Sequence, residues 1–550
     1  MPCTKVQGFF YCLNNYFTNT GFSKDYNKFL STFTLISEIY KMGYKTLQVK
    51  VPTDYSEEHL RNAIVKQLGL KDFSFQIEKK SLDARKKNDI HWVIGLVVSS
   101  GKLEGEEFAA MESLEIPYKK RIEKVVVVGS GPAGFFAAHV LQLAGFQVTI
   151  IERGSKVEQR SRAIGLLESK GEFNGQNNYA FGEGGAGTFS DGKLTSRSKH
   201  ISRERNFILS EYVKAGAPGE IRYMTYPHVG TDNLKIIVAR LRQQFLDNGE
   251  SFLFETQLKD IILKGNRAIG IISDKGEMEA DHVIIATGHS AYDTYRMLMG
   301  KGVQFGTKNF AIGHRIEHPQ TLINKAQWGR EALSGVKAAE YRLSAKSKSG
   351  LGVYTFCMCP GGKVVPAAAF KEKSVVNGMS NYQRDGQYAN AGCVAGVHPD
   401  MLLGHTCTPD EILDWMDELE GNFFALSNSY KIPANMAADY IRKSESKIIT
   451  ESSYPLGLQS APLFNLVPPI VRESIADGLK DFSRKLQGFD LGLLMGLESK
   501  TSSPIQVMRD RDGKCTGFEN LYFIGEGSGF AGGIISSAAD GVKCSIALCS

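Results

Sequence analysis

The residues from Gly129 to Gly134 have the types and spacing that suit dinucleotide binding. Their sequence, GSGPAG, fits the pattern G-x-G-x-x-G. In this pattern the glycines allow a tight turn, a close approach of the backbone to a pyrophosphate, and close packing of a helix on a strand. Glu152 stands 152 − 129 = 23 residues after the first glycine, near the spacing expected for a carboxylate that binds a ribose hydroxyl. Such an acid favours a free 2′-hydroxyl, so the pattern predicts FAD or NAD rather than NADP.

The elements that must position this turn are also visible. Val125 to Val128 is a run of valines, which suits a strand buried on both faces of a parallel sheet. Pro132 fits an early helical position, where its missing N–H is not needed, and Phe135 to Leu143 reads as an apolar helix. A second strand is expected over Val148 to Ile151, and Glu152 follows it directly. This order of strand, turn, helix, strand and acid favours the dinucleotide interpretation over a simple glycine-rich turn.

Two further stretches have the composition of segments that close around a bound dinucleotide. Phe181 to Leu194 is a glycine-rich loop that offers bare N–H groups to a pyrophosphate or a flavin ring. Phe181 and Phe189 can anchor its ends, although the same glycines also suit a flexible surface loop. His282 to Ser290 reads as a buried strand ending in Ala-Thr-Gly. In two-dinucleotide-binding flavoproteins, such a strand returns to the FAD sheet after a β-meander.

The end of the chain narrows the prediction to FAD. Leu521 to Ile524 reads as a strand, and Gly525 to Ile534 leads from it into a helix over Ile535 to Leu548. Glu526 can bind the ribityl hydroxyls. A helix that starts at Gly532-Gly533 can direct its positive end at the N1–O2 edge of a flavin, where the reduced ring carries negative charge. NAD needs no such second closing segment, so the predicted cofactor is noncovalent FAD.

The residues expected to contact FAD come from all of these segments. They are Gly129, Ser130, Gly131, Pro132, Ala133, Gly134, Glu152, Arg153, Gly184, Gly185, Gly187, Thr287, Gly288, Gly525, Glu526, Gly532, Gly533 and Ile534.

Composition indicates the class of protein and its compartment. The 550 residues are 42% hydrophobic and 23% charged, with a mean hydropathy of −0.19, which is ordinary for a soluble protein of roughly two to four domains. A net charge of +6 is too mild to imply a polyanionic partner. The nine scattered cysteines show neither a C-x-x-C motif nor a zinc spacing, so no metal site is expected and a reducing compartment is favoured. With no membrane-spanning apolar run and no signal peptide, the expected location is the cytoplasm.

The motifs divide the chain into segments. Residues 1–42 have no clear period and are interpreted either as a poorly ordered extension or as residues that precede a true start at Met42. The expected segments are the extension (1–42), a small α+β domain (43–100), a linker (101–121), the first part of the FAD-binding domain (122–299), an inserted substrate domain (300–490) and the closing part of the FAD-binding domain (491–550).

The inserted segment has no second G-x-G-x-x-G after a strand. A dedicated nicotinamide domain is therefore not expected, and NAD(P)H is a candidate electron donor that would bind without one. Within the segment, strands are expected over Gly352 to Cys357 and Lys363 to Ala368.

The small domain is expected to be ferredoxin-like. Lys45 to Val51, Phe73 to Lys79 and Ile90 to Val98 read as strands, and Ser56 begins a helix with acidic residues in its first turn. The basic run from Lys79 to Lys87 could bind RNA or another anionic partner. It has no interleaved aromatic residues to stack on bases, so a solvated strand end is favoured and no nucleic-acid partner is expected.

Taken together, these segments resemble one protein family. Over roughly residues 43 to 545, the chain is similar to the bacterial FAD-dependent dehydrogenases often labelled NAD(FAD)-utilising dehydrogenase, within the glutathione-reductase-like flavoprotein superfamily. The stretches that carry the resemblance are Gly182–Leu194, Pro227–Asp232, Ile316–Gln320, Phe356–Gly362, Val376–Ser380, Glu498–Pro504 and Gly525–Ile534. The resemblance implies an α/β fold: a Rossmann-like FAD-binding domain (parallel sheet plus β-meander), an inserted α+β domain and the small N-terminal domain. His314 departs from the family pattern, which has an aliphatic residue there.

Five residues are candidates for chemistry at the flavin. Cys357 and Cys359 are two positions apart, so on a strand they point to the same face and could form a redox dithiol. Such a pair is awkward for a disulfide on an extended strand, and packing of two small soft side chains explains it equally well. His228 and His289 are candidates for proton transfer or for stabilising reduced flavin, with a hydrogen-bonded structural histidine as the alternative. Lys193 can counter an anionic substrate or flavin, or can simply be solvated.

The leading hypothesis is a FAD-dependent oxidoreductase, a dehydrogenase or reductase that moves a hydride to or from flavin N5 with a small-molecule substrate. One alternative is a flavoenzyme that modifies RNA, and another is a protein that binds FAD for sensing without turnover. The sequence leaves open the substrate, the electron donor and acceptor, and the oligomeric state. No membrane partner is expected.

Overall fold

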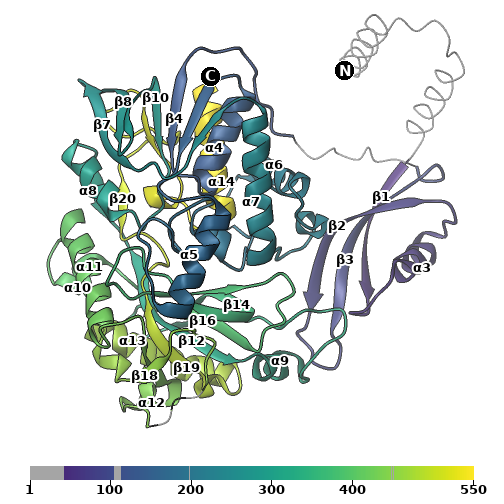
Figure 1. Ribbon diagram of the computed structural model, residues 1–550. Helices are drawn as coiled ribbons and strands as arrows, with labels where there is room; N and C mark the ends of the chain where they lie inside the picture. Colours follow the sequence, from purple (N-terminus) through teal and green to yellow (C-terminus); the bar gives the residue numbers. More distant parts are fainter. Residues whose placement is uncertain (1–42, 105–112, 197, 448, 450, 550) are drawn as a thin grey trace, which may run out of the picture. The chain divides into compact units, whose positions relative to one another are not determined.

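Residues 43–104 and 113–549, apart from residues 197, 448 and 450, are described by a computed structural model of the chain (Figure 1). They form two compact units. The first contains residues 43–51, 55–80 and 93–104, and the second contains the remaining described residues. The predicted extension, including Met42, and part of the predicted linker lie outside the described residues. Within the described ranges, every helix is too short or too polar to cross a membrane.

The first unit has a three-stranded sheet and one helix. Its elements are β1 (Gly43–Val51), α3 (Glu57–Leu68) and the greater part of β2 (Ser74–Asp83) and of β3 (His91–Ser100). The strands lie in the order β1-β3-β2, and α3 begins after Ser56, as predicted. A complete ferredoxin-like fold has the order β-α-β-β-α-β. The described residues of this unit therefore carry only the first four elements of the predicted arrangement.

The second unit contains a five-stranded parallel sheet. Its strands are β4 (Lys124–Val128), β5 (Gln147–Ile151), β6 (Ser251–Leu253), β10 (His282–Ile285) and β21 (Leu521–Phe523). They lie in the order β21-β10-β4-β5-β6, and each neighbouring pair is parallel. The four valines of β4 are 0–4% exposed, as expected for a strand that is covered on both faces. The prediction of a buried parallel strand before the glycine turn is confirmed.

Helices on this sheet bring distant parts of the chain together. α4 (Pro132–Leu143) follows β4, as predicted, and α14 (Ile534–Cys549) packs beside it, so that a blue and a yellow helix lie together in Figure 1. The other helices here are α5 (Val157–Lys170), α6 (Ser202–Lys214), α7 (Gly230–Asp247) and α8 (Tyr292–Gly300). The predicted meander is formed by the antiparallel strands β7 (Leu258–Lys264), β8 (Arg267–Ser273) and β9 (Gly276–Glu279).

The inserted segment forms an eight-stranded sheet. Its strands are β12 (Phe310–Pro319), β13 (Ser344–Lys346), β14 (Gly352–Pro366), β15 (Val376–Ser380), β16 (Tyr388–Val397), β17 (Ile432–Met436), β18 (Leu458–Ser460) and β19 (Leu493–Glu498). Their order is β13-β14-β16-β12-β19-β17-β18, with β15 paired to β14. The helices are α9 (Gln320–Trp328), α10 (Pro399–Leu403), α11 (Pro409–Ala425), α12 (Ala437–Arg442) and α13 (Pro469–Lys485). A short pair, β11 (Phe305–Thr307) with β20 (Ile505–Val507), joins the two ends of the insertion.

The insertion differs from the sequence expectation in two ways. Its sheet continues past residue 490, the predicted boundary, because β19 pairs with both β12 and β17. The two strands predicted over Gly352 to Cys357 and Lys363 to Ala368 are one strand, β14. This strand keeps its pairing with β16 through two register shifts, between Phe356 and Cys359 and between Cys359 and Gly362, instead of breaking at the glycines.

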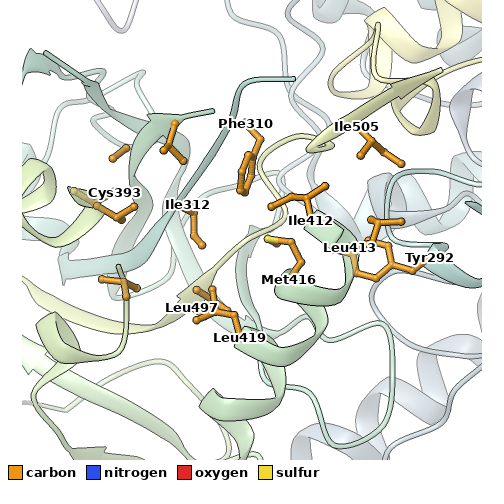
Figure 2. Close-up of a cluster of buried hydrophobic side chains, with 14 of the residues drawn as sticks. Tyr292, Phe310, Ile312, Cys393, Ile412, Leu413, Met416, Leu419, Leu497 and Ile505 are labelled. Carbon is orange, nitrogen blue, oxygen red and sulfur yellow. The ribbon is translucent and has the colours of Figure 1, made fainter. Parts of the chain in front are cut away.

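A buried apolar cluster joins the inserted segment to the rest of the second unit. Figure 2 shows Met416 of α11, Ile312 of β12 and Leu497 of β19 in this cluster, together with Tyr292 of α8. Because α8 follows β10 of the parallel sheet, the cluster connects the inserted sheet with the part of the chain that carries the glycine turn.

His314, the residue that departs from the family pattern, lies fully buried on β12. Its Nδ1 lies 2.8 Å from the carbonyl oxygen of Gly496 on β19. Burial lowers the pKa of His314 to about 4, so the neutral ring donates a hydrogen bond between two neighbouring strands.

Candidate active site and cofactor cavity

A cavity lies at the carboxyl ends of the parallel strands. The glycine turn after β4, the acid after β5 and the Ala-Thr-Gly segment after β10 line it, as does the first residue of α14. They meet because the carboxyl ends of neighbouring parallel strands share one edge of the sheet. The predicted cofactor residues that line the cavity are Gly129, Ser130, Gly131, Pro132, Ala133, Glu152, Arg153, Gly185, Gly187, Thr287, Gly288, Glu526, Gly533 and Ile534.

Four predicted cofactor residues lie outside this lining. A Cβ added to Gly134, Gly184 or Gly525 would come within 2.0–2.5 Å of a neighbouring atom of the protein, so these glycines permit close packing. Gly532 is exposed just before α14. For these four positions, the structure indicates a role in packing or chain direction rather than a place on the cavity wall.

Gly131 leaves space for a pyrophosphate. A Cβ on Gly131 would have its nearest other atom 3.9 Å away, and α4 begins at the next residue. The positive end of α4 therefore lies where a phosphate group can be held. A Cβ on Gly288 or Gly533 would likewise meet no atom within 4 Å. The buried hydroxyl of Thr287 has no hydrogen-bond partner among the described residues. These features fit a bound dinucleotide.

Glu152 holds two glycine loops together. One of its carboxylate oxygens accepts hydrogen bonds from the backbone N–H and the hydroxyl of Ser130, at 3.0 and 2.7 Å. The other accepts hydrogen bonds from the backbone N–H groups of Gly154 and Gly182, at 2.9 and 3.1 Å. A ribose contact by Glu152, as the sequence predicts, would therefore be made by a carboxylate that four protein donors already orient.

Arg160 of α5 shapes the glycine-rich loop, although no motif marks it in the sequence. Its fully buried guanidinium donates hydrogen bonds of 2.7–3.2 Å to the carbonyl groups of Asn178, Tyr179, Gly182, Glu183 and Gly185. Burial lowers the pKa of Arg160 to about 10, so the side chain remains a cation at neutral pH. Helical periodicity could have revealed this residue, because Arg160 shares the buried face of α5 with Val157, Ile164 and Leu167.

A buried ionic cluster contributes to the cavity wall. Asp191 lies 2.8 Å from Nζ of Lys193 and 2.7 Å from Nη2 of Arg384. Burial opposes ionisation of Asp191, but the charges of Lys193 and Arg384 hold the pKa of its carboxyl well below its usual range. Burial likewise opposes the charge of Lys193, and Asp191 nevertheless raises its pKa. Lys193 is therefore a fixed cation that lines the cavity.

The two candidate histidines differ in position. His289 lines the cavity, with Nδ1 3.4 Å from Oε2 of Glu526. Its buried Nε2 has no hydrogen-bond partner within the described part of the chain. His228 does not line the cavity, and its Nε2 lies 3.0 Å from the carbonyl oxygen of Tyr382. Burial lowers the pKa of His228 to about 3, so His228 fits the structural alternative.

Cys357 and Cys359 lie at a bulge in β14. Relative to β16, one extra residue lies between Phe356 and Cys359, and Cys357 has a left-handed φ of 45°. Cys357 lines the cavity, whereas Cys359 is fully buried, with Sγ 3.2 Å from the carbonyl oxygen of Cys357. The regular alternation expected for a straight strand does not hold here.

Three parts of the chain match known protein families. Residues 123–170 match the FAD binding domain, and residues 309–501 match the family described as FAD-dependent protein, C-terminal domain-like. Residues 44–99 match DUF8436, a domain of unknown function. The chain is also 37% identical over 524 residues to an uncharacterized protein of Clostridium beijerinckii, in an alignment that covers 91% of this chain and 98% of the relative.

Several solved structures are similar at low identity. Glycine oxidase from Bacillus cereus has 13% identity and a TM-score of 0.31, with 77% of this chain and 94% of that chain covered. L-proline dehydrogenase from P. horikoshii has 14% identity and a TM-score of 0.30, with 78% and 93% covered. FqzB has 13% identity and a TM-score of 0.35, with 79% and 77% covered. At these values the likeness says nothing about the substrate of this chain.

The clostridial protein and the FAD-binding match together identify the family. The first shares 37% of its residues with this chain over nearly its full length. The second covers β4, the glycine turn, α4 and β5, the segments that line the cavity and that fit a dinucleotide. The chain therefore belongs to a flavoprotein family together with the clostridial protein, and its cofactor is FAD.

Proposed function

We propose that the protein is a FAD-dependent oxidoreductase of the NAD(FAD)-utilising dehydrogenase type, which transfers a hydride between the flavin and a small-molecule substrate. The observation that carries the proposal is that the dinucleotide-binding turn lines the same cavity as Lys193, His289 and Cys357. A protein that only holds FAD needs no buried cation, histidine and thiol in that cavity, whereas a catalytic site does. Bound FAD supplies the redox chemistry, since its isoalloxazine ring accepts or releases a hydride at N5.

Lys193 is suited to hold negative charge in the cavity. Its ammonium group is fixed by Asp191 at 2.8 Å, so it needs no rearrangement when an anionic group of the substrate or a reduced flavin lies nearby. A preorganised charge in a buried site stabilises developing negative charge more than a solvated lysine does.

His289 is suited to move a proton. The contact of Nδ1 with Glu526 orients the ring, which leaves Nε2 to give or take a proton in the cavity. Phe181, Phe189 and Phe356 line the same cavity, and their apolar rings exclude water from the proton-transfer site.

An anaerobic titration tests the proposal. NADH and then NADPH are added to the purified protein while the flavin absorbance at about 450 nm is followed. Rapid bleaching by one of them is expected. His289→Gln is expected to slow the reaction of reduced flavin with its acceptor at least about tenfold without loss of FAD, an effect in the range of a lost general acid or base. The matched control is His228→Gln, which changes a histidine outside the cavity and keeps a donor for the Tyr382 carbonyl.

The FAD-sensing alternative predicts a different result. In that case the protein keeps FAD and is reduced by dithionite, but neither nicotinamide nor any of a panel of reduced small molecules bleaches the flavin. That result would overturn the oxidoreductase proposal and leave the cofactor assignment intact.

A further inference from the structure

Cys357 lies in the FAD cavity on a strained piece of backbone. A positive φ is uncommon for a residue other than glycine, and Cys357 has a φ of 45°. Two cations hold this backbone in place. Nη2 of Arg315 donates to the carbonyl oxygen of Cys357 at 2.8 Å, and Nζ of Lys193 donates to the carbonyl oxygen of Met358. Strain that is stabilised in this way is typical of a side chain that the fold must place for function.

The two thiols of β14 are both influenced by the charges of Lys193 and Arg315. Sγ of Cys359 lies 3.5 Å from Nη2 of Arg315. A hydrogen bond with Cys359 lowers the pKa of the Cys357 thiol against the opposing effect of burial, and the charges of Lys193 and Arg315 lower it further. The same hydrogen bond raises the pKa of Cys359. Of the two thiols, Cys357 therefore loses its proton more readily.

The geometric objection to a bond between these residues applies to a straight strand, and β14 is not straight here. Two positions apart on a straight strand, Cα atoms are about 6.6 Å apart, near the upper limit for a disulfide. The extra residue in β14 and the left-handed conformation of Cys357 bend the chain between the two cysteines. Sγ of Cys359 lies 3.2 Å from the carbonyl oxygen of Cys357.

We propose that Cys357 and Cys359 form a redox-active dithiol that exchanges an electron pair with the bound flavin. The proposal rests on the proposed oxidoreductase function and adds a second redox centre to the same site. In one direction, the S–H bond of Cys359 breaks and an S–S bond forms between the Cys357 thiolate and Cys359. The two electrons released, together with the proton of Cys359, pass to the flavin, which is reduced to its anion. In the other direction, the S–S bond takes up two electrons and one proton from reduced flavin and breaks, which restores the Cys357 thiolate and the Cys359 thiol.

A dithiol beside FAD doubles the number of electrons that the protein takes up. The protein is oxidised with ferricyanide, desalted and titrated anaerobically with dithionite. Since a dithiol and a flavin are each two-electron couples, wild type is expected to take up about four electrons per FAD, and Cys357→Ser or Cys359→Ser about two. The matched control is Cys407→Ser, which changes a buried cysteine in the turn before α11 and is expected to retain about four.

A second measurement needs neither turnover nor a stable variant. Trypsin releases both cysteines in the peptide 349–363, which contains no other cysteine. Wild-type protein is unfolded in iodoacetamide in its oxidised and its reduced state. The peptide is expected to carry no label in the oxidised state and a label on each cysteine in the reduced state.

The results distinguish this proposal from the proposed function. Uptake of only about two electrons per FAD by wild type, or two labels on the peptide in both states, overturns the dithiol and leaves the oxidoreductase intact. Conversely, a protein that takes up about four electrons from dithionite but is reduced by no substrate retains the dithiol and loses the proposed activity.

Discussion

Replacing Arg160 by lysine tests whether this buried arginine shapes the FAD-binding loop. The arginine side chain donates to five backbone carbonyl groups, whereas a lysine ammonium has three donors. At least two hydrogen bonds are therefore lost, although the carbonyl groups of Gly182, Glu183 and Gly185 each keep a second donor. The loss of a buried hydrogen bond costs about 1–3 kcal/mol, so Arg160→Lys is expected to destabilise the loop by about 2–6 kcal/mol.

The assay is FAD binding to the deflavinated protein, together with urea unfolding of the apoprotein. If the whole loss appears in binding, about 2 kcal/mol at the lower end corresponds to a Kd for FAD about 30-fold higher. If the loop is already formed without FAD, the loss appears instead as a lower free energy of unfolding. Arg162→Lys is the matched control, because Arg162 is exposed on the same helix.

The reasoning would be refuted by an Arg160→Lys variant that behaves like Arg162→Lys. A Kd for FAD within about threefold of the wild-type value, combined with an unchanged urea midpoint, would mean that the five carbonyl groups find other partners at no cost. The loop would then hold its shape without the guanidinium.

Three further perturbations have defined outcomes. Gly131→Val places a side chain in the cavity, with its Cβ no closer than 3.9 Å to the nearest protein atom, so its far-UV circular dichroism should match wild type while bound FAD is lost. Retained FAD would contradict the assignment of this turn. Asp191→Asn leaves Lys193 and Arg384 without their shared carboxylate, so it is expected to lower the free energy of unfolding by about 3–5 kcal/mol. A carboxyl with a depressed pKa contributes stability above its ordinary pKa that is lost as the pH falls through the folded value. Wild type should therefore lose stability below about pH 4 more steeply than Asp191→Asn, and parallel urea midpoints would exclude the effect. Finally, native Cys357 should react with iodoacetamide at a nearly constant rate from about pH 8 to about pH 6, because its lowered pKa keeps it a thiolate; a rate that follows an ordinary thiol titration would contradict that state.

The dinucleotide half of the site could be predicted because its chemistry depends on neighbouring residues. A pyrophosphate turn requires glycines at fixed short spacing between a strand and a helix, so Gly129 to Gly134 carries the signal locally. Arg160 could not be found in this way, since its partners are carbonyl groups 18 to 25 residues further along the chain, and any residue type can supply a carbonyl.

The part of the cavity around Cys357 depends on pairing between distant strands, which local patterns do not record. The sequence around Cys357 and Cys359 reads as a regular strand, and the bulge between them exists only relative to β16. Similarly, β19 belongs to the inserted sheet because it pairs with β12, whose residues lie far earlier in the chain. The predicted boundary at residue 490 was placed from motif positions alone, so it lies before β19 instead of after it.

The position of β21 has a consequence for the order of events during protein synthesis. β10 ends at residue 285 and its neighbour β21 begins at residue 521, so the whole insertion is translated between them. Residues at the start of α14, later still, complete the cavity wall. On the ribosome, β4, α4 and β5 emerge early, but the cavity wall is incomplete until β21 and the start of α14 have been made. FAD is therefore captured only after these segments emerge, and nascent chains arrested before β21 should carry no FAD.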